Sequence, residues 1–156
     1  MGEKKAVALV IFRDESREEI VSVLRPEEDQ DHPGAWGLPA TSLKEGEDWE
    51  DAVHRAAENK LGVDVSIEGL MSEGGQARDE YGITLRNYRV EIESGEVEVD
   101  RGQTEGTDYV EWSWRPPNAL RDTAEDSESL CTTLLLDYMD YRFDKPHNIF
   151  KMLHDP

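Results

Sequence analysis

The amino-acid sequence predicts an α+β protein in which helices cover both faces of a mixed β-sheet, as in an α/β/α sandwich. Three observations lead to this class. Apolar runs typical of strands open the chain, an amphipathic helix follows at residues 48–61, and further strands precede one or two helices near the end. With 156 residues the chain is long enough for one sizeable core, so we expect a single domain over residues 1–156.

The first 40 residues predict two strands, a loop and an extended segment. Residues 5–12 and 19–25 are apolar runs separated by the polar stretch RDESRE, so we expect a β-hairpin. The stretch PEEDQDHPG at residues 26–34 contains two prolines, a glycine and four acids, and predicts an exposed loop. Pro39 then favours extended backbone or a turn.

The helix at residues 48–61 has the clearest pattern in the chain. Asp48 is a suitable N-cap, and Asp51 stands four residues before Arg55, a spacing that supports helices. Gly62 is a natural end for the helix. One apolar stripe at spacings of three and four is formed by Trp49, Ala52, Val53, Ala56, Ala57 and Leu61.

The second half of the chain predicts strands and then helices. Strands are expected at residues 63–71, 81–92, 96–99 and 109–114. Pro116 and Pro117 open a helical piece, and a second strong helix is expected at about residues 127–142. This helix contains the single cysteine, Cys131, which we interpret as buried packing, so neither a disulfide nor a cysteine-based zinc site is expected.

Charge restricts the partners of this protein. The 36 acidic and 17 basic residues give a net charge of -19, spread along the whole chain, which disfavours nucleic acid and anionic membranes as partners. Only six of the basic residues are lysines, and such acid-rich surfaces suit high salt, so we hypothesise a halophilic source. The N-terminal apolar run is too short to span a bilayer and shows no cleavage pattern, which indicates a cytoplasmic protein.

Residues 36–63 carry a family resemblance. The segment is similar to the Nudix box, Gly-x5-Glu-x7-Arg-Glu-U-x-Glu-Glu-x-Gly-U, where U is a bulky aliphatic residue. This chain keeps Glu47, Arg55, Gly62 and Val63 at those spacings, after a WGLP sequence that resembles the WxLPGG found in many members. The resemblance implies a Nudix-like α/β/α sandwich with a box-like segment at residues 41–63. It also implies a nucleotide-like small-molecule ligand, and a homodimer is a further expectation because many relatives dimerise.

The residues that hold metal in the family are absent from this box. Thr41 takes the place of the first glycine, and the three helix glutamates are replaced by Ala56, Asn59 and Lys60. In the family those glutamates bind Mg²⁺ or Mn²⁺, which polarises the diphosphate and activates water. An alanine offers no ligand, an asparagine offers one neutral oxygen, and a lysine repels the cation, so the box itself predicts no metal site.

Three interpretations of the box remain open. In the first, Lys60 partly replaces the charge of the metal, and the protein binds a phosphorylated ligand with weak or no hydrolysis. In the second, a Nudix-type diphosphate hydrolase cleaves a nucleoside diphosphate linked to another moiety, using Mg²⁺ or Mn²⁺ held by Glu47, Glu58, Asp79 or Glu80. In the third, the domain is a scaffold without small-molecule chemistry.

The candidate site residues follow from these interpretations, and each also has a structural explanation. Lys60 either faces solvent or is turned inward by the apolar stripe, and Glu47 with Arg55 is also a typical structural ion pair. The catalytic candidates are Glu47, Arg55 and Glu58, and the ligand-binding candidates are Arg25, Trp36 and Lys60. The four histidines show no metal-binding spacing.

Overall fold

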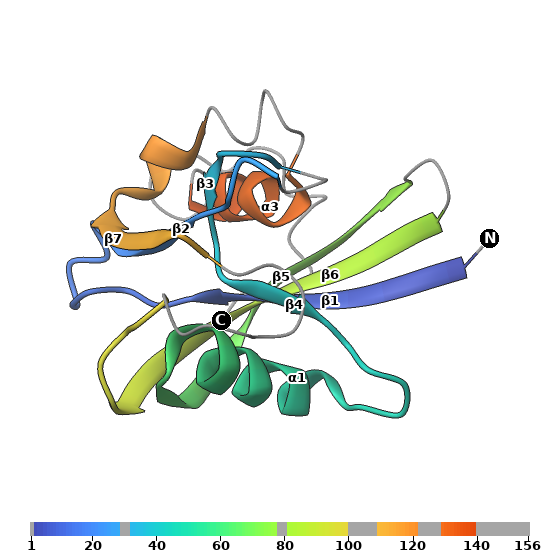
Figure 1. The fold of residues 1–156 in the computed structure, drawn as a ribbon, viewed down its shortest axis with the longest axis horizontal. Helices are drawn as coiled ribbons and strands as arrows, with labels where there is room; N and C mark the ends of the chain where they lie inside the picture. The colour runs from blue at the N-terminus through green and yellow to red at the C-terminus, as the bar shows by residue number, and fades with distance from the viewer. Residues whose placement is uncertain (1, 29–31, 78–80, 100–108, 122–128, 140–156) are drawn as a thin grey trace.

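A computed structural model describes residues 2–28, 32–77, 81–99, 109–121 and 129–139 of the chain (Figure 1). The strands are β1 (Gly2–Val10), β2 (Ile20–Leu24), β3 (Trp36–Gly37), β4 (Ala40–Ser42), β5 (Asp64–Ala77), β6 (Tyr81–Ser94) and β7 (Glu111–Arg115). The helical elements are α1 (Trp49–Ala56), a π-helical turn η1 (Ala57–Leu61), a 3-10 turn η2 (Pro117–Leu120) and α3 (Leu130–Met139).

Two sheets organise these strands. The larger is mixed, with the order β4-β1-β6-β5, in which β1 and β6 run parallel and the other pairs are antiparallel. The smaller sheet is antiparallel and has the order β3-β2-β7. Helix α1 lies on one side of the larger sheet and α3 on the other, as Figure 1 shows. The predicted α+β class, with an α/β/α arrangement around a mixed sheet, is confirmed.

The side chains of β1 point alternately to the two faces of the larger sheet and are apolar on both, which explains why a helix covers each face. Val7 and Leu9 pack on the α1 side with Val53, whereas Ala6 and Ala8 face the α3 side. A strand that is apolar on both faces is stable only in the middle of a sheet with a cover on each side. The sequence run at residues 5–12 therefore marks the central layer of the fold.

The predicted hairpin of the first two apolar runs is present only next to its turn. Phe12 and Ile20 form an antiparallel bridge, which is flanked by hydrogen bonds from Val21 N–H to the Ile11 carbonyl and from Arg13 N–H to the Glu19 carbonyl. Beyond this point the two runs separate, and β1 and β2 belong to different sheets. β1 instead pairs with β4 and with β6, because a strand buried on both faces needs a neighbour along each edge.

The predicted helix at residues 48–61 is present but changes its winding. Regular α1 ends at Ala56, and the wider turn η1 completes the segment. Gly62 ends it in the left-handed region with φ 72°, and its N–H donates to the Glu58 carbonyl at 3.1 Å. Both Lys60 and Leu61 are buried in this turn. Isolated π-helical turns of this kind are frequent at functional sites.

The remaining predictions fare differently. The strands expected at residues 63–71, 81–92 and 109–114 correspond to β5, β6 and β7, of which β5 and β6 are 14 residues each. The strand expected at residues 96–99 is wrong: Glu98 N–H donates to the Leu61 carbonyl, so this segment closes the helix end instead of a sheet. Cys131 is buried on α3, as predicted. The helices in the described residues are all too short or too polar to cross a membrane.

Candidate functional site

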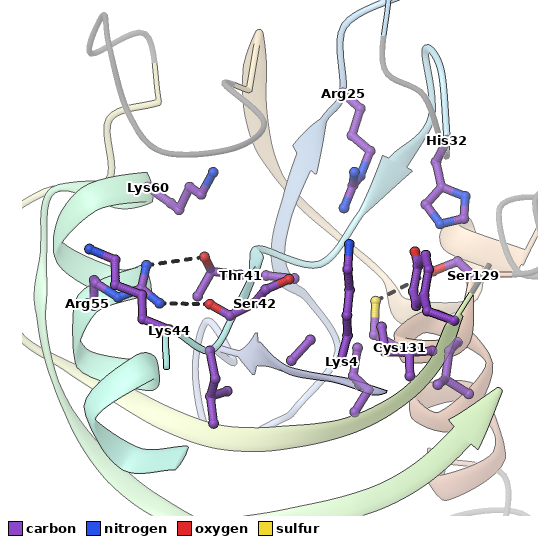
Figure 2. A pocket seen from close by; sticks show the side chains of 17 residues that line it. Lys4, Arg25, His32, Thr41, Ser42, Lys44, Arg55, Lys60, Ser129 and Cys131 are labelled. Carbon is purple, nitrogen blue, oxygen red and sulfur yellow. Dashed lines mark hydrogen bonds between the residues drawn. The ribbon is translucent and has the colours of Figure 1, made fainter. Parts of the chain in front are cut away.

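A cavity of about 410 Å³ is lined by residues of strands β1, β4 and β6, of the helical segment α1–η1 and of the start of α3. Its apolar floor comes from β1 and β6, through Ala6, Ile83 and Leu85. The polar side chains around it come from widely separated parts of the chain, as Figure 2 shows. The other described lining residues are Lys4, Arg25, His32, Ala40, Thr41, Ser42, Leu43, Lys44, Arg55, Lys60, Tyr81, Ser129, Leu130 and Cys131.

The charge of this lining is opposite to that of the protein. Five of the lining residues are lysine or arginine, and none of the described lining residues is aspartate or glutamate. The chain as a whole carries a net charge of -19 and only six lysines, three of which (Lys4, Lys44 and Lys60) line this cavity. Gathering cations in one concave site raises the local concentration of anionic ligands. The cavity is therefore suited to an anion.

Lys60 is turned inward and is only 4% exposed. It lies four residues after Ala56 and seven after Val53, so it continues the apolar stripe of α1. Its ammonium lies 5.4 Å from the centroid of the buried Tyr109 ring, close enough for a cation–π interaction. The interpretation of Lys60 as a solvent-facing lysine is wrong, because this helix position faces the protein.

Tyr109 itself is anchored to the β-strand beside the cavity. Its hydroxyl accepts a hydrogen bond from Ala40 N–H at 2.9 Å and donates to the Ala40 carbonyl at 3.2 Å. The same side chain therefore fixes β4 and supports the Lys60 ammonium. This role could not be predicted from the sequence, because Tyr109 is 69 residues from Ala40 and 49 from Lys60.

Arg55 and Glu47 form a two-point ion pair. Arg55 Nε donates to Glu47 Oε2 at 2.9 Å and Nη2 donates to Oε1 at 2.8 Å, while Lys44 N–H donates to the same Oε1 at 2.9 Å. The hydrogen bond from Arg55 is the main reason that the pKa of Glu47 falls from 4.5 to about 2, and the bond from Lys44 lowers it further.

The rest of the Arg55 guanidinium holds β4. Its Nη2 also donates to the Ser42 carbonyl at 2.7 Å, and Nη1 donates to Thr41 Oγ1 at 3.4 Å. The pair therefore ties the loop before α1 to the helix and to the strand. Arg55 lines the cavity, whereas Glu47 is not among its described lining residues.

The other candidate residues lie in different places. Arg25, at the end of β2, lines the cavity. Glu58 is exposed and lies outside the described lining. Trp36 begins β3, where the Arg115 guanidinium lies 4.4 Å from its ring centroid, and it does not line the cavity either. Asp79 and Glu80 lie outside the described residues.

The described residues do not fit a divalent cation. Mg²⁺ and Mn²⁺ require oxygen ligands, preferably carboxylates. Within the described ranges, no three or more His, Cys, Asp or Glu side chains are grouped so as to hold a metal ion. The helix residues that line the cavity are Arg55 and Lys60, and both carry a positive charge that repels a divalent cation.

Sequence reasoning overlooked several lining residues. Lys4, Lys44, His32 and Ser129 come from four separate segments, and their positions in the sequence suggest no common site. One signal was available: the chain has only six lysines, so each of them is a candidate for a specific role.

Comparisons with known proteins agree on one family. A sequence model described as NUDIX domain matches residues 2–133. The E. coli ORF135 protein has a similar solution structure, with a TM-score of 0.68, 19% identity, and coverage of 95% of this chain and 96% of that chain. A NUDIX hydrolase from Nitrosomonas europaea gives a TM-score of 0.68 at 16% identity, covering 94% of this chain and 95% of that one.

A third structure is that of a C. elegans Ap4A hydrolase, as a binary complex. It has a TM-score of 0.61 at 17% identity and covers 86% of this chain and 93% of that chain. The sequence matches no curated protein. At these levels of identity, the structural similarity shows a common fold.

Proposed function

The chain belongs to the Nudix family, and from this premise we propose that its cavity binds a nucleotide-type ligand with a diphosphate group, with weak or no hydrolysis. Nudix hydrolases generally use divalent metal ions, and structural neighbours of this chain include nucleotide hydrolases. In this proposal the ligand meets the positive charge of lysine and arginine side chains, whereas in ordinary family members it meets a bound metal ion.

One observation carries the proposal: the described cavity lining contains five lysine and arginine residues and no carboxylate. A diphosphate carries negative charge on several oxygens and needs a positive counterpart in a binding site. In this chain Lys60 replaces a metal-binding glutamate of the family and contributes that positive charge directly. The Tyr109 ring and the buried helix turn hold its ammonium at the cavity.

Hydrolysis needs more than binding. The attacking water requires a metal ion or a general base placed beside the diphosphate. Glu47 is already held by Arg55 and the Lys44 N–H, and Glu58 is exposed and lies outside the described cavity lining. These placements favour binding over turnover, and they argue against Glu47 or Glu58 as metal ligands.

An active hydrolase and a scaffold are the two alternatives, and one pair of assays separates them from the proposal. A panel of nucleoside diphosphates linked to other groups is incubated with Mg²⁺ or Mn²⁺ at high salt, and binding of the same compounds is measured by calorimetry with EDTA. We expect binding with EDTA and no appreciable turnover with metal. Efficient turnover of any compound would refute the proposal and support an active hydrolase. If no compound binds, the proposal also fails and the scaffold alternative is supported.

Three variants connect the result to the cavity. Lys60→Met should weaken binding, whereas Lys5→Met, which removes a lysine on the opposite face of β1, should leave it unchanged. A triple variant with Ala56→Glu, Asn59→Glu and Lys60→Glu should gain affinity for Mn²⁺, because it restores carboxylates on one helix face. Equal Mn²⁺ affinity of the triple variant and the native protein would contradict our assignment of the site.

We propose in addition that the protein is one domain over residues 1–156 and works in a cytoplasm of high salt concentration. The net charge of -19 supports the high-salt setting, since salt screens the repulsion between acidic groups. A homodimer is part of the same proposal because many Nudix proteins dimerise. Light scattering coupled to size exclusion in concentrated KCl tests it, and a monomer mass would exclude it.

A further inference from the structure

We infer that the ligand of this cavity carries two separate anionic groups, because the cavity has cations on two sides with an apolar floor between them. This inference rests on the proposed binding function and specifies the ligand class. The helix-side cations are Lys44, Arg55 and Lys60, and the strand-side cations are Lys4 and Arg25. Figure 2 shows the two groups apart, on either side of the cavity.

The helix-side cations are held by neighbouring residues. Arg55 is bonded to Glu47 and Thr41, so its charge is largely matched by the Glu47 carboxylate. Lys60 is buried against the Tyr109 ring. A cation fixed at low exposure interacts strongly with an anion in contact, because little water screens the pair. We therefore assign the diphosphate to this side, with Lys60 as its main contact.

The strand-side cations come from strand segments on the other side of the floor. Lys4 lies on β1, and its ammonium is 4.3 Å from the centroid of the Tyr81 ring. Arg25 follows β2, and its N–H donates to the Ala35 carbonyl at 2.9 Å, which fixes the backbone there. Lys5, the next residue on β1, points to the opposite face of the sheet, over the Trp49 ring at 5.7 Å. The strand pleat thus directs Lys4, and not Lys5, to the cavity.

The floor between the two groups suits the uncharged part of a ligand. Ala6, Ile83 and Leu85 present apolar surface on which a sugar or base can lie. Buried Ser129 and Cys131 add polar atoms at the start of α3, on the side of the cavity where Figure 2 shows Lys4. A lone diphosphate would contact only one of the two groups of cations. A nucleoside diphosphate derivative with a further phosphate or carboxylate engages both.

Two matched ligand pairs test the inference. UDP-glucuronate differs from UDP-glucose by a carboxylate on the sugar, and ADP-ribose 2′-phosphate differs from ADP-ribose by one phosphate. Affinities are measured by calorimetry at one ionic strength with EDTA. We expect the extra anion to strengthen binding about fivefold to tenfold in at least one pair, a modest factor because Lys4 is exposed.

Variants identify the cations responsible. Lys4→Met or Arg25→Met should reduce the ratio within that pair to about one, whatever happens to the absolute affinities. Lys5→Met is the matched control, with the same change of charge outside the cavity, and should keep the native ratio. Thermal unfolding of each variant shows whether it is folded. If Lys4→Met is not folded, Lys4→Gln takes its place.

The possible results are distinct. If the native protein binds both members of both pairs equally, the inference fails and the proposed function stands. A ratio that survives both Lys4→Met and Arg25→Met also overturns the inference. If no compound of either pair binds the native protein, the proposed function itself fails.

Discussion

Replacing Glu47 by glutamine tests the ion pair that joins the loop, helix α1 and strand β4. The glutamine has nearly the same shape, but it loses the charge that faces the Arg55 guanidinium. Its side-chain amide also places a donor where the carboxylate accepts hydrogen bonds from Arg55 and from the Lys44 N–H. Both partners of the ion pair are mostly buried, with 14% and 16% of their side chains exposed, so water replaces these bonds poorly.

The size of the effect follows from the pKa of Glu47. The fall from 4.5 to about 2 corresponds, at about 1.4 kcal/mol per pH unit, to roughly 3 kcal/mol of stability at neutral pH. Because the pKa is lower in the folded state, this stability is present above about pH 4.5 and is lost as the pH falls toward about 2. Glu47→Gln should therefore lower the free energy of unfolding by about 2–3 kcal/mol at pH 7.

Urea unfolding of the native protein and the variant at several pH values between 7 and 3 measures this difference. The difference between the two unfolding free energies cancels the contribution from titration of the other acidic residues, because both proteins share them. Glu45→Gln, at an exposed position in the same loop, is the matched control and should change stability by less than about 0.5 kcal/mol. A Glu47→Gln difference below about 1 kcal/mol at pH 7, or one that does not shrink toward pH 3, would refute the reasoning.

Three further predictions concern stability. Tyr109→Phe should cost about 1–3 kcal/mol in urea unfolding, because the Ala40 N–H and carbonyl both lose their partner; an unchanged midpoint would contradict the anchoring role. Gly95→Ala should destabilise more than Gly46→Ala: both have positive φ (95° and 79°), but a Cβ at Gly95 would lie 2.9 Å from the Gly62 carbonyl oxygen, whereas none of the described atoms lies within 4 Å at Gly46. Equal melting temperatures of the two variants would contradict this prediction, because they would show that the Gly62 carbonyl can move away from the added Cβ at no cost. Raising KCl should increase the melting temperature, as expected for a net charge of -19, and a melting temperature independent of salt would reject the halophilic hypothesis.

The sequence predicted the layers of the fold better than the pairing of its strands. The alternation of Val7 and Ala8 on β1, and the stripe of α1, are local patterns, and both identify the buried faces correctly. Pairing depends on which segments meet in space. Hence a hairpin of residues 5–12 with 19–25 is predicted in full, whereas these runs pair only next to the turn and β1 itself pairs with the distant β6. Residues 96–99 alternate like a strand, yet they close the helix end through Glu98.

In the candidate site, too, the residues that follow local sequence patterns could be predicted, and those that depend on long-range packing could not. Arg55 with Glu47 could be predicted because the two are eight residues apart, about two helix turns, and the box spacing marks them. The burial of Lys60 was also readable, since it continues the stripe of Ala56 and Val53. Lys4 and Tyr109 could not be assigned, because each reaches the site only through long-range packing of the sheet and the loops.

High salt should reduce the contribution of the strand-side cations to ligand binding more than that of the helix-side cations. At about 1 M salt the screening length is only about 3 Å, so a cation acts on a ligand mainly through direct contact. Lys60 is buried and keeps such a contact dry, whereas Lys4 is exposed and shares any anion with water and ions. Salt should therefore weaken the contribution of the second anion before it weakens binding of the diphosphate. Titrating the matched ligand pairs from low to high KCl measures this, and a ratio that is constant while overall affinity falls would contradict it. On the proposed function, burial protects the charge of Lys60, which takes the place of a bound metal, from screening by a concentrated salt solution.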